Sequence, residues 1–205
     1  SLEDGEPAYD IVADCAYDAI ELKPEQVPTG SIVYHGTLAI RSPVSRLTLD
    51  AIIRDSAPAG VFLDVNLRPP WWDGDSVMQH VGAADWVKLN HDELRQLGAD
   101  SAGELLEAHQ LKGLVVTMGA EGAQAWTDAG EHLMVRPAAS VSIVDTVGAG
   151  DAFTAVIMLG IVRGWPLAET LERAQAFASQ IVGQRGATVH DRDFYAPLIE
   201  DWGLS

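Results

Sequence analysis

Apolar runs and amphipathic stretches alternate along most of this chain. Runs of four to eight apolar residues bounded by polar or glycine residues are typical of buried strands, whereas apolar residues spaced three and four apart are typical of helices. These patterns predict strands at 31–36, 61–66, 85–90 and 114–119, and helices at 43–57, 75–83, 91–98, 101–110, 149–163 and 166–183. They also predict a small β-ribbon within 8–20, and a β-hairpin in which 122–127 and 131–136 flank the turn Asp128-Ala129-Gly130.

The order of these elements predicts an α/β protein with three layers, α/β/α, in which helices cover a mostly parallel central sheet. Ligands of such proteins bind beyond the carboxyl ends of the strands. The predicted parallel strands all end in polar or glycine residues, namely His35-Gly36, Asp64 followed by Asn66 and Arg68, Lys88 with Asn90, and Thr117 with Gly119. One edge of the sheet is therefore predicted to carry the chemistry.

A glycine turn, DTVGAGD at 145–151, precedes the most apolar predicted helix. Three β-prone residues lead into it: Val141, Ile143 and Val144. Gly148 and Gly150 allow a tight turn with free backbone N–H groups, and Asp151 stands in the first turn of the helix. A helix start that attracts an anion beside a carboxylate that accepts a proton is suited to phosphoryl transfer. The simpler interpretation is that Asp151 only complements the helix dipole.

Two other phosphate-binding motifs do not fit this turn. A dinucleotide fingerprint requires a third glycine where this chain has Phe153, and it follows the first strand of its domain, whereas this turn lies late in the chain. The P-loop pattern G-x-x-x-x-G-K-[ST] does not occur.

Composition narrows the classes of partner. The 30 acidic and 13 basic residues give a net charge of −17, which argues against nucleic acid or an anionic membrane as a partner. A length of 205 residues with 47% hydrophobic content is typical of a globular protein with one sizeable core. The single cysteine, Cys15, fits a reducing cytoplasm, and no apolar run is as long as a transmembrane helix. A cytoplasmic location is therefore expected.

Five segments carry a family resemblance: HGTLA (35–39), DVNLRPPWW (64–72), VKLNHDEL (87–94), VVTMGAEGA (115–123) and DTVGAGDAF (145–153). The last resembles the second signature of the phosphofructokinase B (pfkB)/ribokinase family of ATP-dependent sugar kinases, and the first two resemble its fructokinase branch. The resemblance extends over essentially the whole chain. It implies a ribokinase-like fold and transfer of the γ-phosphate of ATP to a sugar hydroxyl.

The resemblance also implies roles for the glycine turn. Asp151 accepts the proton of the attacking sugar hydroxyl, and the N–H groups of Gly148, Ala149, Gly150 and Asp151 stabilise the charge on the transferring phosphoryl group. Because the transition state is loose, orienting the hydroxyl matters more than the basicity of the carboxylate.

Further roles follow from the resemblance at the strand ends. Thr117, Gly119 and Gly122 form a loop for the phosphates and ribose of ATP, and Gly186 belongs to a loop over the adenine. Asn90 and Glu93 lie near Mg²⁺ and the phosphates, Glu93 through water, because Mg²⁺ keeps several waters. Asn66 and Arg68 contact the sugar or a phosphate, and Asp145 is a ligand of a monovalent cation such as K⁺.

The same residues have simpler structural interpretations. Asn90 and Glu93, three apart at a predicted helix start, have the spacing of a capping box. The glycines at 119 and 122 fit an ordinary β-turn. Arg68 fits a pair with a surface carboxylate. Lys88 fits either a phosphate contact or an ion pair at the end of its strand, and the ion pair is favoured.

The chain departs from the family at two points. Val156 stands where the family usually has a glycine, and neither the early sugar-binding acid nor the Gly-Gly signature of the family is found. We therefore expect a ribokinase-like domain over 23–205, N-terminally truncated, preceded at 1–22 by a partial β-lid remnant. Loss of the first strands would expose a sheet edge and apolar surface, and this exposure predicts a homo-oligomer. The alternative function is a catalytically inactive kinase homologue that binds nucleotide or acts as a scaffold.

Overall fold

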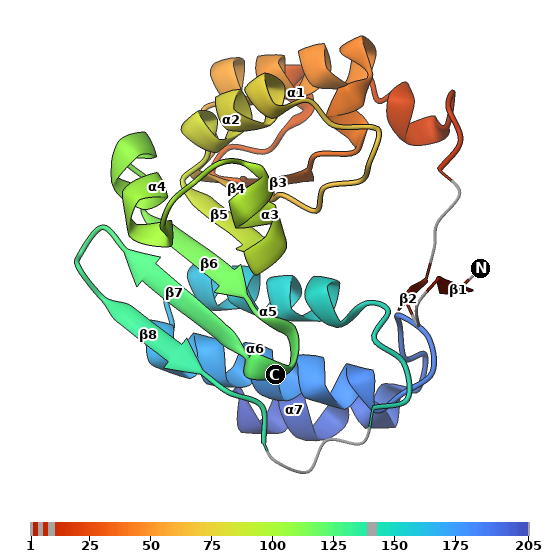
Figure 1. Cartoon of the computed structure of the whole chain (residues 1–205), viewed down its shortest axis with the longest axis vertical. Helices are drawn as coiled ribbons and strands as arrows, with labels where there is room; N and C mark the ends of the chain where they lie inside the picture. Colours follow the sequence, from red (N-terminus) through yellow and green to blue (C-terminus); the bar gives the residue numbers. More distant parts are fainter. Residues whose placement is uncertain (1, 4–5, 8–10, 139–142, 205) are drawn as a thin grey trace. The chain divides into compact units, whose positions relative to one another are not determined.

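The computed structural model describes residues 2–3, 6–7, 11–138 and 143–204. The chain divides into two compact units, Ser1–Met134 and Val135–Ser205, which follow one another along the colour bar of Figure 1. The predicted division into 1–22 and 23–205 rests on the family resemblance and stays a prediction. No helix among the described residues is long and apolar enough to cross a membrane.

A six-stranded sheet has its strands in chain order, β3-β4-β5-β6-β7-β8. The parallel strands are β3 (Ile32–Gly36), β4 (Gly60–Asp64), β5 (Trp86–Asn90) and β6 (Gly113–Thr117). β7 (Ala123–Thr127) runs antiparallel to β6, and β8 (His132–Val135) lies beside β7. Each strand overlaps a segment predicted from its apolar pattern, so the mostly parallel sheet is confirmed.

The register of this sheet brings polar strand ends together. Gly36 lies opposite Asp64, Asp64 lies opposite Lys88, and Asn90 lies opposite Thr117. Because parallel strands end at the same edge, the predicted gathering of polar groups at one edge of the sheet is confirmed.

One face of the sheet carries the largest apolar core. Side chains alternate along a strand, so every second residue of β4, β5 and β6 points to this face. Crossovers of one hand between consecutive strands place the connecting helices on the same side. The core joins Val61, Leu63, Val65, Val87, Leu89, Leu114 and Val116 to Val77 and Val81 of α2 (Gly74–Ala83), Leu94 of α3 (His91–Gln96) and Leu105 and Leu106 of α4 (Ala102–His109). Ile53 of α1 (Pro43–Asp55) packs against it.

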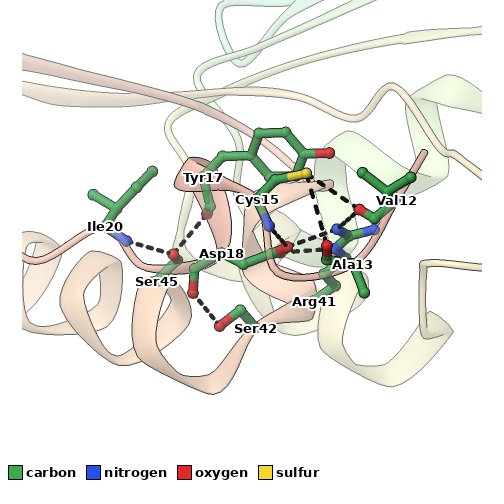
Figure 2. Close-up of polar contacts among 9 residues, drawn as sticks. All are labelled: Val12, Ala13, Cys15, Tyr17, Asp18, Ile20, Arg41, Ser42 and Ser45. Atoms are coloured by element: carbon green, nitrogen blue, oxygen red, sulfur yellow. Dashed lines mark hydrogen bonds and ion pairs between the residues drawn. The ribbon is translucent and has the colours of Figure 1, made fainter.

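The segment before β3 differs from the prediction. A two-stranded antiparallel pair, β1 (Leu2–Glu3) with β2 (Glu6–Pro7), begins the chain, but 11–20 holds no strand. Instead Ala16–Asp18 form the 3-10 helix η1. Side chains of α1 and the residues just before it hold this segment by hydrogen bonds, as Figure 2 shows, and these bonds replace strand pairing. The ribbon predicted within 8–20 is therefore wrong for residues 11–20, while 8–10 lie outside the described residues.

The second unit is helical. α5 (Ala149–Arg163) packs on α6 (Leu167–Val182), and η5 (Arg192–Phe194) and α7 (Ala196–Asp201) follow. Both long helices match their predicted ranges within one residue, whereas the six-residue α7 has too little pattern to be predicted. Gly160 lies so close to Thr170 that a Cβ would clash with its side chain.

Candidate active site

The glycine turn of the second unit is organised around the carboxylate of Asp145. Its Oδ1 accepts a hydrogen bond from the amide of Val147, and its Oδ2 accepts one from the amide of Gly186, each at 3.0 Å. These amides, Val147 first, hold the pKa of Asp145 below its ordinary value. Asp145 thereby ties the turn to the loop at 184–187, which the resemblance assigns to the nucleotide site.

Backbone bonds and a close approach strengthen this connection. The amides of Val144 and Asp145 both donate to the carbonyl of Val182, at 2.9 and 3.1 Å. Gly148 has φ of 84°, and a Cβ on it would lie 2.6–2.8 Å from atoms of Ala187. Only glycine satisfies both conditions at this position. The β-prone residues before the turn form no strand where they are described, since Ile143 and Val144 have no strand structure. Val141 lies outside the described residues.

Helix α5 begins at this turn without a side-chain cap. Its N-cap is Gly148, and the amide of Ala152 starts the helical ladder by donating to the Gly148 carbonyl at 2.8 Å. The amide of Ala149 donates to the Thr146 carbonyl at 3.4 Å. First-turn amides have no acceptor within their own helix, and those of Gly150 and Asp151 have none among the other described residues, so they can bind an anion. The role predicted for Ala149 stays a prediction and has this competing acceptor.

The carboxylate of Asp151 has a different environment from that of Asp145. Asp151 is exposed, and its side chain accepts no hydrogen bond from the described residues. Ala152, Phe153 and Val156 of the same helix are buried, so the exposed carboxylate lies at the start of a well-packed helix. Val156, at the position where the family usually has glycine, fits within this helix at 3% exposure.

In the first unit, Glu93 connects two strand ends. Its Oε1 accepts from the amide of Leu67, and its Oε2 accepts from the amide of Asn90, both at 2.8 Å. Asn90 Oδ1 in turn accepts from the Glu93 amide at 2.8 Å, which completes the capping box of α3. Glu93 is 5% exposed. The capping interpretation is thus confirmed, and the same carboxylate also fixes the segment between the two predicted substrate residues.

Those substrate residues, Asn66 and Arg68, flank Leu67 just after β4. Asn66 has a positive φ of 42°, a conformation that asparagine tolerates better than most residues. Both side chains are partly exposed, as a ligand contact requires.

A buried ion pair lies beneath this edge. Lys88 Nζ is 3.0 and 3.2 Å from the two carboxylate oxygens of Asp64, and the residues are 7% and 1% exposed. The ion pair predicted for Lys88 at its strand end is confirmed. A buried charge is costly without its partner, so the pair holds β4 and β5 in register at the edge that carries Asn66 and Asn90.

The loop predicted to bind ATP phosphates is a tight turn between β6 and β7. Thr117 ends β6, and Gly119 and Gly122 have φ of 56° and 99°. The amide of Met118 donates to the Gly122 carbonyl at 2.8 Å, and the amide of Gly122 donates to the Gly119 carbonyl at 3.1 Å. The glycines are therefore required by the turn itself, and the nucleotide contact stays a prediction.

Some contacts at this edge carry no signal in the sequence. Thr37 is 2% exposed, and its Oγ1 donates to the carbonyl of Val65 at 2.5 Å, which joins the segment after β3 to the end of β4. The partners are 28 residues apart, and nothing in the local sequence around Thr37 predicts this hydrogen bond. No group of three or more His, Cys, Asp or Glu side chains within the described ranges is arranged to hold a metal ion.

Comparison with known proteins identifies the family. The sequence pattern of the pfkB family of carbohydrate kinases matches residues 9–192. The chain belongs to this family. A fructokinase of Rhizobium leguminosarum bv. trifolii is 35% identical over 124 residues, which are 56% of this chain and 37% of that protein.

Solved structures of pfkB-type kinases share the fold. The aminoimidazole riboside kinase of Salmonella enterica, complexed with aminoimidazole riboside and an ATP analog, has a TM-score of 0.68 at 27% identity over 80% of this chain and 61% of its own. A fructokinase double mutant of Vibrio cholerae O395, bound to fructose, ADP and potassium, has a TM-score of 0.65 at 28% identity over 82% and 60%. The predicted ribokinase-like α/β fold is confirmed. The chain spans 37% of the Rhizobium fructokinase and 60–61% of these two kinases.

Proposed function

We propose that this chain carries the nucleotide-binding and proton-accepting residues of an ATP-dependent sugar kinase of fructokinase type. The start of α5 is the observation that supports this most: free first-turn amides stand beside an exposed carboxylate on a buried helix. Membership in a carbohydrate kinase family supports phosphoryl transfer to a sugar as the reaction. Phosphoryl transfer needs positioning and charge stabilisation more than covalent chemistry from the protein.

Asp151 orients the sugar hydroxyl and takes its proton as the hydroxyl oxygen bonds to the γ-phosphorus and the bond to the ADP oxygen breaks. The carboxylate is exposed, and its oxygens accept no hydrogen bond from the described residues. The amides of Gly150 and Asp151 donate to the oxygens of the transferring group, where charge is concentrated.

The nucleotide is proposed to contact Thr117, Gly119 and Gly122 through backbone groups, and Gly186 through the loop that Asp145 anchors. Solved relatives bound to an ATP analog and to ADP support ATP as the phosphoryl donor. Asn66 and Arg68, which flank the Leu67 amide that Glu93 binds, are proposed to contact the sugar or a phosphate.

Magnesium neutralises phosphate charge in such reactions. Among the residues proposed for this site, Glu93 suits it through a bridging water. Both Glu93 oxygens already accept amide hydrogen bonds, so their remaining lone pairs suit a contact through water. Asp145 is proposed as the ligand of a monovalent cation, and the Vibrio fructokinase was solved with potassium.

Turnover and binding must be measured together on the same chain. We expect ADP formation from ATP with D-fructose in the presence of Mg²⁺ and K⁺, with D-ribose and aminoimidazole riboside as alternative acceptors. ATP affinity is measured in parallel by calorimetry. Nucleotide binding with no turnover on any acceptor would overturn the kinase proposal and support the alternative, an inactive homologue that binds nucleotide.

A further inference from the structure

A hollow of about 260 Å³ opens in the first unit, and Glu93 is not among the residues that line it. Its walls come from the segment after β3, the start of α1, residues 70–73 and the start of α2. Trp71, Trp72 and Ile40 give it apolar sides, and Arg41 and Arg46 give it positive charge. At this volume it admits a small molecule rather than a drug-sized one.

The guanidinium of Arg41 is fixed in one wall. Its Nε and Nη2 donate to the two carboxylate oxygens of Asp18 at 2.8 and 2.7 Å, and Nη2 also donates to the Val12 carbonyl at 2.7 Å (Figure 2). Its planar group lies 4.2 Å from the ring centroid of Trp71 and 5.3 Å from that of Tyr17. The Arg41 side chain is only 8% exposed, and its Nη1 is buried without a hydrogen-bond partner among the described residues. One donor of a fixed cation thus remains unsatisfied.

Arg46 supplies a second cation whose charge is not neutralised. It is half-buried, lines the hollow, and forms no ion pair or side-chain hydrogen bond with the described part of the chain. Other arginines on the same unit are paired, as Arg54 is with Asp55 at 2.7 Å. A free guanidinium beside apolar walls is unusual on a chain with a net charge of −17, because most of its surface repels anions.

The lining contains one acidic side chain, Asp73, which is already engaged. Its Oδ2 accepts a hydrogen bond from the amide of Ser76 at 2.9 Å, as the N-cap of α2. Because Asp18 balances the charge of Arg41, Arg46 is the lining cation that has no carboxylate partner among the described residues. A planar guanidinium group binds the oxygens of a carboxylate or phosphate more strongly than it binds a neutral ligand group.

We propose that this hollow is a binding site for a small organic anion, with a carboxylate or phosphate group on a flat, apolar body. The oxyanion pairs with Arg46 and lies close to the fixed charge of Arg41, while the body packs on Trp71 and Trp72. None of the residues that line the hollow is among those proposed for phosphoryl transfer, so anion binding can be tested without turnover.

Three probes that share a phenyl ring test whether the hollow prefers an anion, with binding to the whole chain measured by calorimetry. Benzoate carries a carboxylate, phenyl phosphate carries a phosphate, and benzyl alcohol is neutral. We expect at least one of the two anions to bind with a dissociation constant of about 1 mM or tighter, and benzyl alcohol to bind at least about tenfold more weakly. The anion that binds more tightly distinguishes the two oxyanion classes. Absence of binding by both anions, or equal binding of benzyl alcohol, would overturn the proposal.

Two substitutions on α1 locate the site. Arg46→Gln is expected to weaken anion binding about tenfold or more, and Arg46→Lys to weaken it less because the charge remains. Arg54→Gln removes the same charge outside the hollow and is expected to change the affinity by less than about twofold. Equal loss in Arg46→Gln and Arg54→Gln would contradict a specific site.

A measurement on the unsubstituted chain covers the case in which Arg46→Gln does not fold. Indole N–H resonances of ¹⁵N-labelled protein report each tryptophan separately. The anion is expected to shift those of Trp71 and Trp72 and to leave Trp165 and Trp202, which belong to the second unit, in place. Shifts confined to Trp165 and Trp202 would refute the location.

Discussion

Two carboxylates on the same turn have opposite environments. Asp145 uses both oxygens to bind the amides of Val147 and Gly186, whereas Asp151 is exposed. The two amide bonds let Asp145 hold the loop in place, and its remaining lone pairs leave the proposed cation contact open. Asp151 has no such partner among the described residues and is the acid proposed to meet the substrate. The sequence places both acids on the turn, but only the tertiary structure distinguishes their environments.

Asp151→Asn tests the proposed proton acceptor. The amide has nearly the same shape but cannot take a proton, so kcat for ADP formation is expected to fall about 100-fold or more. ATP affinity, measured by calorimetry, is expected to stay within about twofold because the backbone amides remain. Asp201→Asn on α7 is the matched control with unchanged activity. Unchanged turnover in Asp151→Asn would exclude the role.

His35 is expected to make the stability of the protein depend on pH. Its Nε2 is buried without a hydrogen-bond partner among the described residues, Nδ1 lies 3.2 Å from the Gly36 carbonyl, and the ring of His80 lies 5.6 Å away. Burial, as the largest cause, lowers the pKa of His35 from 6.5 to about 4, while the nearby Asp50 opposes the shift. His80 Nε2 is itself 3.3 Å from Asp50 Oδ1.

The direction of this dependence follows from proton uptake. Between pH 6.5 and about 4 the unfolded chain binds a proton at this histidine and the folded chain does not. The free energy of unfolding is therefore expected to be highest above pH 6.5 and to fall toward pH 4, by at most about 1.4 kcal/mol per pH unit from this group.

Denaturant titrations at pH 7, 6 and 5 measure the effect. His35→Gln is expected to reduce the slope with pH, and His91→Gln, at an exposed position on α3, to leave it unchanged. An identical slope in His35→Gln and the unsubstituted chain would show that His35 is not responsible.

At the scale of elements, the start of α5 depends on a glycine for two separate reasons. Gly148 has a positive φ, and its backbone lies against Ala187. Gly164, at the other end of the same helix, also has a positive φ, of 65°, but nothing lies within 4 Å of a Cβ there. Substitution of Gly164 therefore tests the cost of backbone strain alone, whereas substitution of Gly148 tests backbone strain together with a steric clash.

Gly164→Ala is expected to lower the free energy of unfolding by about 1–2 kcal/mol, the cost of a left-handed residue with a Cβ. Gly148→Ala is expected to cost more, and also to weaken ATP binding, because the loop at 184–187 must move. Denaturant unfolding and calorimetry measure the two effects. Equal losses of stability in the two variants would show that the close approach to Ala187 has no energetic consequence.

Most elements could be predicted because each has a clear local pattern. The strands at 61–66 and 114–119 are apolar runs ended by polar residues, and the helix at 149–163 is apolar on most sides. The ribbon predicted at 8–20 failed over its described part because its alternation is short. Arg41, Ser42 and Ser45, more than 20 residues away, satisfy its backbone and side chains instead.

At the scale of the whole molecule, the predicted site residues divide between the two units. Asn66, Arg68, Asn90, Glu93, Thr117, Gly119 and Gly122 belong to Ser1–Met134, and Asp145, Gly148, Ala149, Gly150, Asp151 and Gly186 belong to Val135–Ser205. Each unit therefore contributes a part of the proposed function that can be tested by its own substitutions.

The sheet has an edge that favours association between chains. β3 is the terminal strand of the described sheet, with Tyr34 47% exposed on it and Leu47 of α1 66% exposed. An edge strand with apolar side chains is a template for pairing. We predict a homo-oligomer that Tyr34→Lys weakens, as measured by light scattering coupled to gel filtration. Thr127→Lys, on β7 inside the sheet order, is the control. A stable monomer of the unsubstituted chain would contradict the prediction.

The sequence by itself determined the order of strands and helices, the polar edge of the sheet and the family, because these depend on local periodicity and on short contiguous motifs. Only the tertiary structure decided what the polar groups do. Glu93 binds the Leu67 amide, Asp145 binds the Gly186 amide, and Arg41 is held by Asp18, over separations of 26, 41 and 23 residues. Such bonds join residues that only the folded chain brings together, and a local sequence pattern does not specify which distant residues meet.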